Sequence, residues 1–379
     1  MTTSIDRVLE GFRAGTTAAL ARAVSIVENH RPGFDQLLSA IHPLVGRARR
    51  IGITGPPGAG KSTLTTRLAR TYRTAGLRVG IVAVDPTSPF TGGALLGDRI
   101  RMEDVALDPG VFIRSMATRG SLGGLATATR EVCDVLDGFG MDVILLETVG
   151  VGQSELDISR AADTTLVVLV PESGDSIQTL KAGVMEIADV FAVNKADRPG
   201  ADRLRNDIEL MLGLRTGAAM QAPAHHGIDL SRLGDRDAQR QAMNPARAAR
   251  EAAARAGHPE SVDAWTPPVL RTVAAKGEGI ELVVDALDRH FHYLVASGEL
   301  QLRRRQRLRE RVMEVVEGQL RQRLWHDAAT LTWLEHQLPM LEAGTVAPFS
   351  VADALRARSG VLLTGVEHSS VSSLLPGTN

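Results

Sequence analysis

The chain has too few cysteines for a disulfide framework or for a metal site built from several thiolates. It contains 379 residues but a single cysteine, Cys133. One cysteine cannot form an internal disulfide, and it cannot supply a thiolate cluster for a metal. The sequence therefore excludes both kinds of architecture.

Aromatic residues and long apolar runs are also scarce. Aromatics make up 3% of the chain, and the longest apolar strings, such as residues 143–146 and 166–171, have the length of a strand. No stretch reaches the about 18 apolar residues that a membrane-spanning helix needs, and the N-terminus has no secretory pattern. We therefore expect a cytoplasmic protein without a membrane partner. Its aliphatic core would be typical of a parallel sheet covered by helices.

Neither sign of charge dominates. Lys and Arg total 43, Asp and Glu total 44, and the formal net charge is −1. General nucleic-acid binders usually have a marked basic excess, so we expect no nucleic-acid partner. The six arginines between Arg303 and Arg311 are interpreted as the solvated face of a helix.

Strand-like and helix-like segments alternate through the middle of the chain. The strand-like segments are residues 50–55, 78–85, 111–115, 142–147, 164–170, 190–194 and 269–275. Strands that alternate with helices indicate an α/β fold with a doubly wound, mostly parallel sheet.

Three parts of the chain are predicted. Residues 1–48 form an N-terminal helical segment, and residues 49–298 form the α/β domain, with a polar insertion at about 215–262. Residues 299–379 form a C-terminal helical extension that begins with one long helix over 299–337. Apolar positions on that helix, from Leu308 to Leu324, need a partner surface. We therefore expect a homodimer that forms through the extension.

The strongest chemical signal is a glycine-rich segment that follows the first predicted strand. It reads GPPGAGKS from Gly55 to Ser62 and fits the P-loop pattern G-x-x-x-x-G-K-[ST]. Glycines let backbone N–H groups surround phosphates, the lysine reaches the terminal phosphates and the serine hydroxyl binds Mg²⁺. Lys61 is therefore also assigned to catalysis. The predicted phosphate-binding residues are Gly55, Pro56, Pro57, Gly58, Ala59, Gly60, Lys61, Ser62 and Thr63.

A second motif selects the base. Residues 194–197 read NKAD after a strand and fit the guanine motif N-K-x-D. The carboxylate of Asp197 can accept from the ring N–H and the 2-amino group of guanine, whereas adenine offers neither donor there. The pair of motifs predicts GTP as the substrate. The predicted base-binding residues are Asn194, Lys195 and Asp197, with backbone contacts from Val273, Ala274 and Ala275, although the usual serine of such loops is absent.

Polar residues near other strand ends are candidates for Mg²⁺ and for the attacking water. Glu147 ends a strand and is expected to hold Mg²⁺ with Ser62, while the N–H of Gly150 would face the γ-phosphate. Asp98 is assigned to the metal and Asp85 to catalysis, although either acid could serve either role. Gln153 is a second candidate for orienting the water.

At these residues the sequence resembles the MeaB/ArgK family of GTPases, which includes the methylmalonic aciduria type A protein. The resemblance covers roughly residues 10–340 and departs at 215–262. The segments that carry it are residues 52–64, 82–102, 119–126, 147–155, 194–202 and 267–280.

The resemblance implies a function as well as a fold. It implies a Mg²⁺-dependent GTPase with a slow intrinsic rate, which produces GDP and phosphate. Such a protein is a G-protein chaperone of an adenosylcobalamin-dependent acyl-CoA mutase, with methylmalonyl-CoA mutase as the expected client. It would gate cofactor loading and protect the mutase from inactivation. The resemblance also implies a homodimer and a nucleotide-responsive switch at residues 171–181, beside the one at 147–155.

Two other functions are open to a P-loop protein. A nickel or cobalt metallochaperone GTPase would need soft or imidazole ligands, and the chain has one cysteine and no histidine-rich tract. An ArgK-type transport-associated kinase or ATPase would not need the guanine motif. A pull-down that identifies the partner would separate these alternatives from a mutase chaperone.

Overall fold

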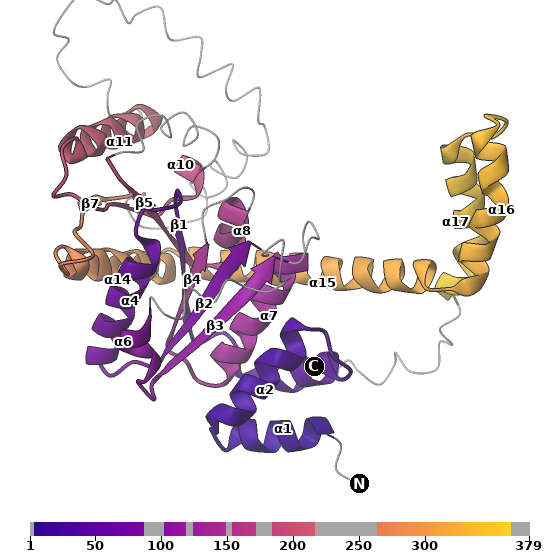
Figure 1. Cartoon of the computed structure of the whole chain (residues 1–379), viewed down its shortest axis with the longest axis horizontal. Coiled ribbons are helices and arrows are strands. Elements are labelled where there is room, and N and C mark those ends of the chain that lie inside the picture. Colours follow the sequence, from indigo (N-terminus) through magenta and orange to yellow (C-terminus); the bar gives the residue numbers. More distant parts are fainter. Residues whose placement is uncertain are drawn as a thin grey trace, which may run out of the picture. The chain divides into compact units, whose positions relative to one another are not determined.

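The computed structural model describes residues 4–86, 102–118, 124–148, 154–171, 184–216 and 264–364. The chain divides into two compact units, Met1–Arg304 and Arg305–Asn379, with the division inside helix α15 (Glu299–Trp325). The first unit contains the sheet and the second contains the C-terminal helices (Figure 1). The domain boundaries expected from the sequence, after residues 48 and 298, stay predictions.

A seven-stranded sheet forms the centre of the first unit, as counted over the described residues. Its order is β3-β2-β4-β1-β5-β6-β7, and every neighbouring pair is parallel. The predicted doubly wound parallel sheet is therefore confirmed. The strands are β1 (Arg49–Thr54), β2 (Val79–Pro86), β3 (Val111–Thr118), β4 (Val143–Thr148), β5 (Thr164–Leu169), β6 (Val190–Val193) and β7 (Val269–Arg271).

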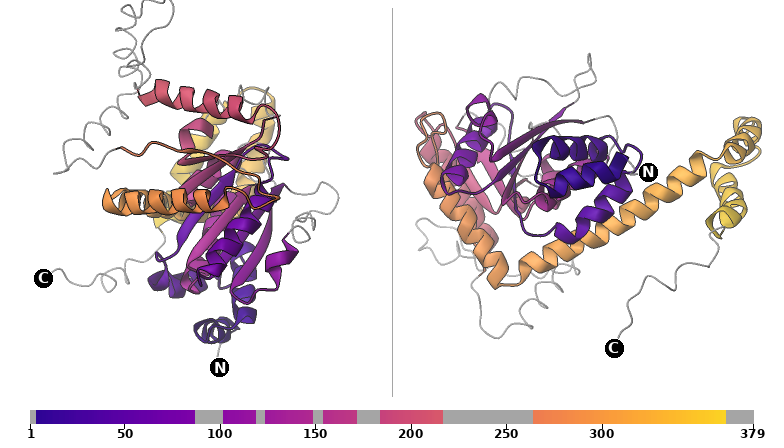
Figure 2. Two further views of the ribbon diagram at one scale, coloured as in Figure 1. Left: turned by 90° about the vertical axis from the view of Figure 1, so that its left-hand side faces the viewer. Right: turned by 90° about the horizontal axis from the view of Figure 1, so that it is seen from below.

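Helices cover both faces of this sheet (Figure 2). Within β4, Ile144 and Leu146 pack into the core of one face, and Val143 and Leu145 pack into that of the other. Burial on both sides explains why such strands are continuous apolar runs. The first face is covered by α7 (Gly124–Gly138) and α8 (Ser154–Ala161). The N-terminal helices α1 (Ser4–Arg13), α2 (Thr17–Glu28) and α3 (Phe34–Ile41) extend the same core, and α2 and α3 pack against α7. The second is covered by α4 (Lys61–Thr74), α6 (Glu103–Ala106) and α14 (Ile280–Ala296). A third apolar cluster packs α10 (Val184–Ile187) and α11 (Ala201–Thr216) around β6 and β7.

The C-terminal extension is helical, as predicted, but its first helix is shorter than expected. The single helix predicted over 299–337 is wrong, because α15 ends at Trp325 and α16 (Ala328–Glu342) begins a new axis. Asp327 causes the break, since its carboxylate accepts from the N–H of Thr330 at 2.8 Å and caps α16. Helix α17 (Pro348–Thr364) follows. Nowhere in the described ranges is a helix both long and apolar enough to cross a bilayer.

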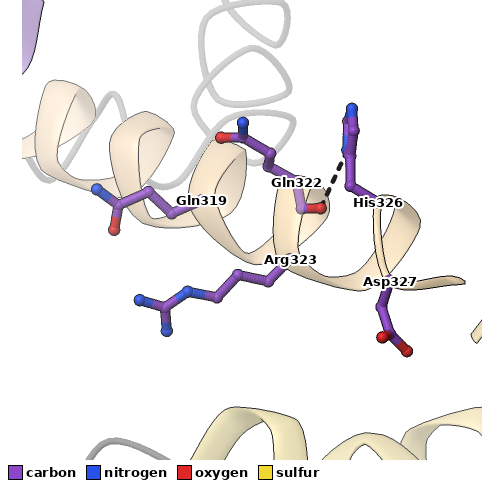
Figure 3. Close-up of a pocket in the computed structure, with 5 residues that line it drawn as sticks. All are labelled: Gln319, Gln322, Arg323, His326 and Asp327. Atoms are coloured by element: carbon purple, nitrogen blue, oxygen red, sulfur yellow. Dashed lines mark hydrogen bonds between the residues drawn. The ribbon is translucent and has the colours of Figure 1, made fainter. Parts of the chain in front are cut away.

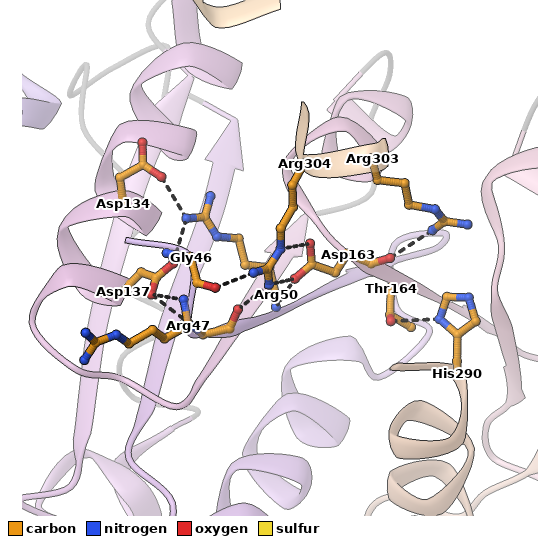
Figure 4. Close-up of polar contacts among 11 residues, drawn as sticks. Gly46, Arg47, Arg50, Asp134, Asp137, Asp163, Thr164, His290, Arg303 and Arg304 are labelled. Atoms are coloured by element: carbon orange, nitrogen blue, oxygen red, sulfur yellow. Dashed lines mark hydrogen bonds and ion pairs between the residues drawn. The ribbon is translucent and has the colours of Figure 1, made fainter. Parts of the chain in front are cut away.

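Buried carboxylates at the amino ends of β5 and β6 bind the start of α15, and Figure 4 shows the contacts of the first of them, Asp163. Arg304 Nη2 lies 2.9 Å from Asp163 Oδ2, and Arg303 Nη2 lies 3.3 Å from Asp189 Oδ1. Arg303 also donates to the carbonyl oxygen of Asp163 at 2.9 Å. The interpretation of residues 303–311 as a solvated face is therefore corrected at its first two arginines. They compensate carboxylates that the sheet buries.

A second polar cluster fixes the chain where it enters β1 (Figure 4). Asp137 of α7 accepts from the backbone N–H groups of Gly46, Arg47 and Ala48 at 2.8, 3.1 and 3.0 Å. The guanidinium of Arg50 donates to the same carboxylate at 3.2 Å. These bonds join the end of the N-terminal helices to the sheet.

His290 of α14 is buried close to these groups. Its Nδ1 lies 2.8 Å from the hydroxyl of Thr164, and its side chain is 1% exposed. Burial is the largest cause that lowers the pKa of His290, from 6.5 to about 4, and Arg303 lowers it further, whereas Asp189 and Asp163 raise it. The ring is therefore neutral in the folded protein near pH 7.

Folding stability is expected to fall as the pH drops from about 6.5 towards 4. In this window the unfolded chain binds a proton on His290 that the folded chain does not. The neutral ring of His290 makes its full contribution to the free energy of unfolding above about pH 6.5. The loss of this contribution at low pH reaches at most about 3 kcal/mol. Urea unfolding at pH 7.5 and pH 5 would measure it. The difference should shrink in His290→Gln and persist in the control His336→Gln, which changes an exposed histidine. An equal difference in both variants would contradict this assignment.

Candidate functional site

The carboxyl edge of the sheet brings together segments that are far apart in the sequence. The chain leaves β1 into residues 55–60, Glu147 lies near the end of β4, and Asn194 follows β6 directly. Parallel strands place all their carboxyl ends at one edge, which is where α/β sheets bind ligands.

Two glycines of the 55–60 loop are required by its shape. Gly55 has φ +140° and Gly60 has φ +87°, which favour glycine. A Cβ on Gly55 would collide with the carbonyl oxygen of Val168, and one on Gly60 would collide with the amide of Asn194. The loop is therefore pressed against β5 and against Asn194, which follows β6.

Lys61 is the first residue of α4 and is 5% exposed. Its Nζ donates to the carbonyl oxygens of Gly55 and Pro56 at 2.8 and 3.0 Å. The first N–H groups of a helix have no partner within the helix, so this end of α4 attracts anions. The ammonium and the helix end together form a site of positive potential.

Ser62 and Glu147 are in direct contact. The hydroxyl of Ser62 donates to Glu147 Oε1 at 2.5 Å, and Glu147 is 3% exposed. A hydroxyl and a carboxylate are hard oxygen donors of the kind that Mg²⁺ prefers, so this donor set fits the ion.

Several other predicted site residues cannot be placed. Asp85 lies in β2 and its backbone pairs with Ala117 of β3, but its side chain is not among those that the structure describes. Asp98, Gly150 and Gln153 lie outside the described residues, as do residues 217–262 of the predicted insertion. Their roles stay predictions.

The amide of Asn194 joins three elements. Its Nδ2 donates to the carbonyl oxygen of Ala59 at 2.8 Å, and its Oδ1 accepts from the N–H of Ala274 at 3.0 Å and the hydroxyl of Thr272 at 3.2 Å. Asn194 is 3% exposed. The phosphate loop, β6 and the loop after β7 are thereby held together.

Asp197 lies beside the loop that follows β7. Its Oδ2 lies 3.2 Å from Nζ of Lys276, which lowers the pKa of Asp197 and keeps the carboxylate ionised. The loop is a tight turn, because the N–H of Lys276 donates to the carbonyl oxygen of Val273 at 2.9 Å. Val273 and Ala274 are buried, and Ala275 is exposed. An ionised acceptor and an exposed backbone segment are thus adjacent.

Three residues of this site were missed by the sequence motifs. Thr272 and Lys276 contact Asn194 and Asp197, and Arg67 of α4 donates to the carbonyl oxygens of Ala274 and Ala275 at 3.1 and 2.8 Å. No motif contains Arg67. Its contact depends on the position of the 273–276 loop beside α4, which local sequence patterns do not give.

A separate hollow lies in the second unit, at the end of α15 (Figure 3). His326 Nδ1 lies 3.1 Å from the carbonyl oxygen of Gln322 there. Within the described ranges, no group of three or more His, Cys, Asp or Glu residues is placed to hold a metal ion. The lining is that of a solvated helix end: Gln319, Gln322, Arg323, His326 and Asp327.

Comparisons with known proteins agree with this geometry. A family model described as "Methylmalonyl Co-A mutase-associated GTPase MeaB" matches residues 20–329. A protein of Pyrococcus abyssi is 46% identical over 314 residues, which cover 83% of this chain and 84% of that protein. The mouse "Methylmalonic aciduria type A homolog, mitochondrial" is 29% identical over 369 residues, 93% of this chain and 78% of that protein. A solved structure titled "LAO/AO transport system kinase" matches with a TM-score of 0.59 and 25% identity, over 93% of this chain and 97% of that one.

Proposed function

The chain belongs to the MeaB family of mutase-associated P-loop GTPases, and from this premise we propose that it is the G-protein chaperone of an adenosylcobalamin-dependent acyl-CoA mutase. Its enzymatic activity is the hydrolysis of GTP. Methylmalonyl-CoA mutase is the proposed client, because the family description names it. The protein would gate cofactor loading and protect the mutase, with hydrolysis as the timing step.

The observation that carries the nucleotide assignment is the amide of Asn194, which ties the phosphate loop to the loop after β7. Residues 55–63 would bind the phosphates. Asp197 would accept from the two guanine donors. Ala275 is exposed, and its N–H, which has no acceptor among the described residues, would donate to the guanine carbonyl.

Hydrolysis is phosphoryl transfer to water, so the residues act by position and charge. The ammonium of Lys61, which now contacts two backbone carbonyls, would bind the β- and γ-phosphate oxygens. Ser62, Glu147 and Asp98 are the proposed Mg²⁺ residues, and the bound ion would neutralise phosphate charge. Asp85 and Gln153 are the candidates for orienting water, and Gly150 for a γ-phosphate contact.

The contact between Ser62 and Glu147 also supports a switch function. Glu147 is the first residue of the predicted switch segment 147–155, and its carboxylate contacts Ser62 in the first turn of α4. A change in the bound phosphates would therefore act on the residue from which that segment starts. This is the coupling that a nucleotide-dependent chaperone needs.

The client is tested with the purified full chain and candidate acyl-CoA mutases, including methylmalonyl-CoA mutase. We expect a complex on size-exclusion chromatography whose affinity differs between GDP and a non-hydrolysable GTP analogue. We also expect the mutase to raise the hydrolysis rate. The absence of both effects with every mutase tested would contradict the proposal. A pull-down that recovered a nickel enzyme or a transport protein would favour the two alternatives instead.

We further propose a homodimer that forms through α15. Apolar side chains on this helix are at least 40% exposed in the chain taken alone: Leu308, Val312, Met313, Val315, Val316 and Leu320. Such a stripe on a solvated helix is typical of a subunit contact.

Two glutamates on this stripe are expected to produce a monomer. In Val312→Glu with Val316→Glu, each dimer would bury four new carboxylates without partners, which is strongly unfavourable. Multi-angle light scattering measures the mass, and GTP binding should be kept. The control Gln306→Glu adds charge at another exposed position of α15. A double variant that remains dimeric would place the contact elsewhere.

A further inference from the structure

Arg67 makes a bidentate contact that the roles of the known motifs do not explain. It lies on α4, six residues after Lys61, and its guanidinium binds two successive carbonyl oxygens of the loop after β7. Nε lies 3.1 Å from the oxygen of Ala274, and Nη2 lies 2.8 Å from that of Ala275. We propose that Arg67 is the positioning residue for recognition of the 6-oxo group of the purine.

The planarity of the peptide bond lets Arg67 set the direction of a neighbouring N–H. The carbonyl oxygen of Ala274 and the N–H of Ala275 belong to one peptide unit, which is trans. In a trans peptide these two groups point in opposite directions. By holding the carbonyl towards α4, Arg67 therefore aims the N–H of Ala275 away from α4.

Most backbone N–H groups of this loop already have acceptors within the protein. The N–H of Ala274 is bound to Asn194, that of Lys276 to the oxygen of Val273 and that of Gly277 to the oxygen of Ala274. The N–H of Ala275 has no acceptor within the described ranges, and the residue is exposed. The turn thus presents one N–H to a ligand, and Arg67 sets its direction.

The purine bases differ in the group that they carry at C6. Guanine and hypoxanthine carry an acceptor oxygen at C6, whereas adenine carries an amino donor there. An N–H that is held in place cannot rotate away or lose its proton when adenine binds. The N–H and the amino group of adenine would then be two donors that face each other. Arg67 therefore acts on the choice between 6-oxopurine and adenine through the oxygen at C6, while Asp197 accepts from the ring N–H and the 2-amino group. This inference rests on the proposed guanine site.

Arginine suits this role better than lysine. Its planar guanidinium holds two oxygens at a fixed spacing, and two bonds fix the orientation of the loop as one cannot. Arg67→Lys should therefore weaken the binding of 6-oxopurine nucleotides less than a variant that removes the charge does.

The test measures competition of GDP, IDP and ADP against a fluorescent GDP analogue on the full chain. In Arg67→Met, which keeps the apolar stem, we expect GDP and IDP each to bind about tenfold more weakly, equivalent to about 1.4 kcal/mol. The affinity for ADP should be unchanged, and so should the ratio of the affinities for GDP and IDP. Arg67→Lys should be intermediate. The control is Arg70→Met, an exposed arginine one turn further along α4.

Four results would overturn the inference. GDP affinity in Arg67→Met could equal that of the wild type, or all three nucleotides could weaken alike, which would mean damage to α4. The GDP to IDP ratio could change, which would mean that Arg67 acts through Asp197. A wild-type protein without preference for GDP over ADP would overturn the guanine site itself, whereas an intact preference that ignores Arg67 overturns only this inference. Melting temperatures of both Arg67 variants separate misfolding from these outcomes.

Discussion

Lys61→Ala is expected to slow the hydrolysis of GTP by roughly 10²- to 10³-fold, as loss of a preorganised charge does in other active sites. The ammonium of Lys61 is held over the phosphate loop by the carbonyl oxygens of Gly55 and Pro56. In phosphoryl transfer, negative charge is redistributed over the β- and γ-phosphate oxygens, so a fixed cation stabilises the transition state.

Single-turnover hydrolysis with excess protein measures this effect without interference from product release. The fold should survive, because the apolar face of α4, including Leu64 and Leu68, is untouched. Arg70→Ala, which removes an exposed cation from the same helix, is the matched control. A Lys61→Ala rate close to wild type would contradict the assignment of the P-loop.

Asp197→Asn is expected to change the preferred nucleotide from GTP to xanthosine triphosphate. Xanthine has an oxygen where guanine has its 2-amino group, and the asparagine amide can donate to that oxygen while accepting from the ring N–H. With GTP, two donors would face each other, and an unpaired polar group costs about 1–3 kcal/mol. GTP affinity should therefore fall about 5- to 150-fold, with a comparable gain for the xanthine nucleotide.

Titration of both nucleotides against wild type and variant measures the exchange of specificity. The variant also loses the ion pair with Lys276, but both side chains are exposed, so the fold should be little affected. Asp285→Asn, an exposed site on α14, is the control. Unchanged GTP affinity in Asp197→Asn would mean that residues 194–197 are an ordinary turn after a strand.

Much of the fold was predictable because the information is local. The apolar runs that became β1, β4 and β5 are buried on both faces, and this double burial is what makes a strand continuous in hydrophobicity. The glycines of the 55–60 loop were predictable for a similar reason, since a left-handed backbone at Gly60 excludes most other residues.

Local patterns failed where a single side chain decided the outcome. Positions 326–327 of the helix expected over 299–337 hold neither glycine nor proline, so the sequence gives no sign of a break there. The helix nevertheless ends at Trp325, because Asp327 caps a new helix. Arg303 and Arg304 belong to a run that has the composition of a solvated surface, but Asp189 and Asp163 are buried opposite them. Composition does not report which charges will meet a buried partner.

The sequence by itself determined the parallel α/β class, the P-loop pattern and the N-K-x-D pattern. Each of these depends on residues that are close together in the chain, either through their hydrophobic period or through the backbone conformation that they allow. The tertiary structure alone decided that Arg67 reaches Ala274 and Ala275, and that Lys276 lies beside Asp197. These contacts join segments about two hundred and about eighty positions apart in the chain. They depend on the order of the strands and on the helices packed over them, and neither is encoded in the spacing of any one segment.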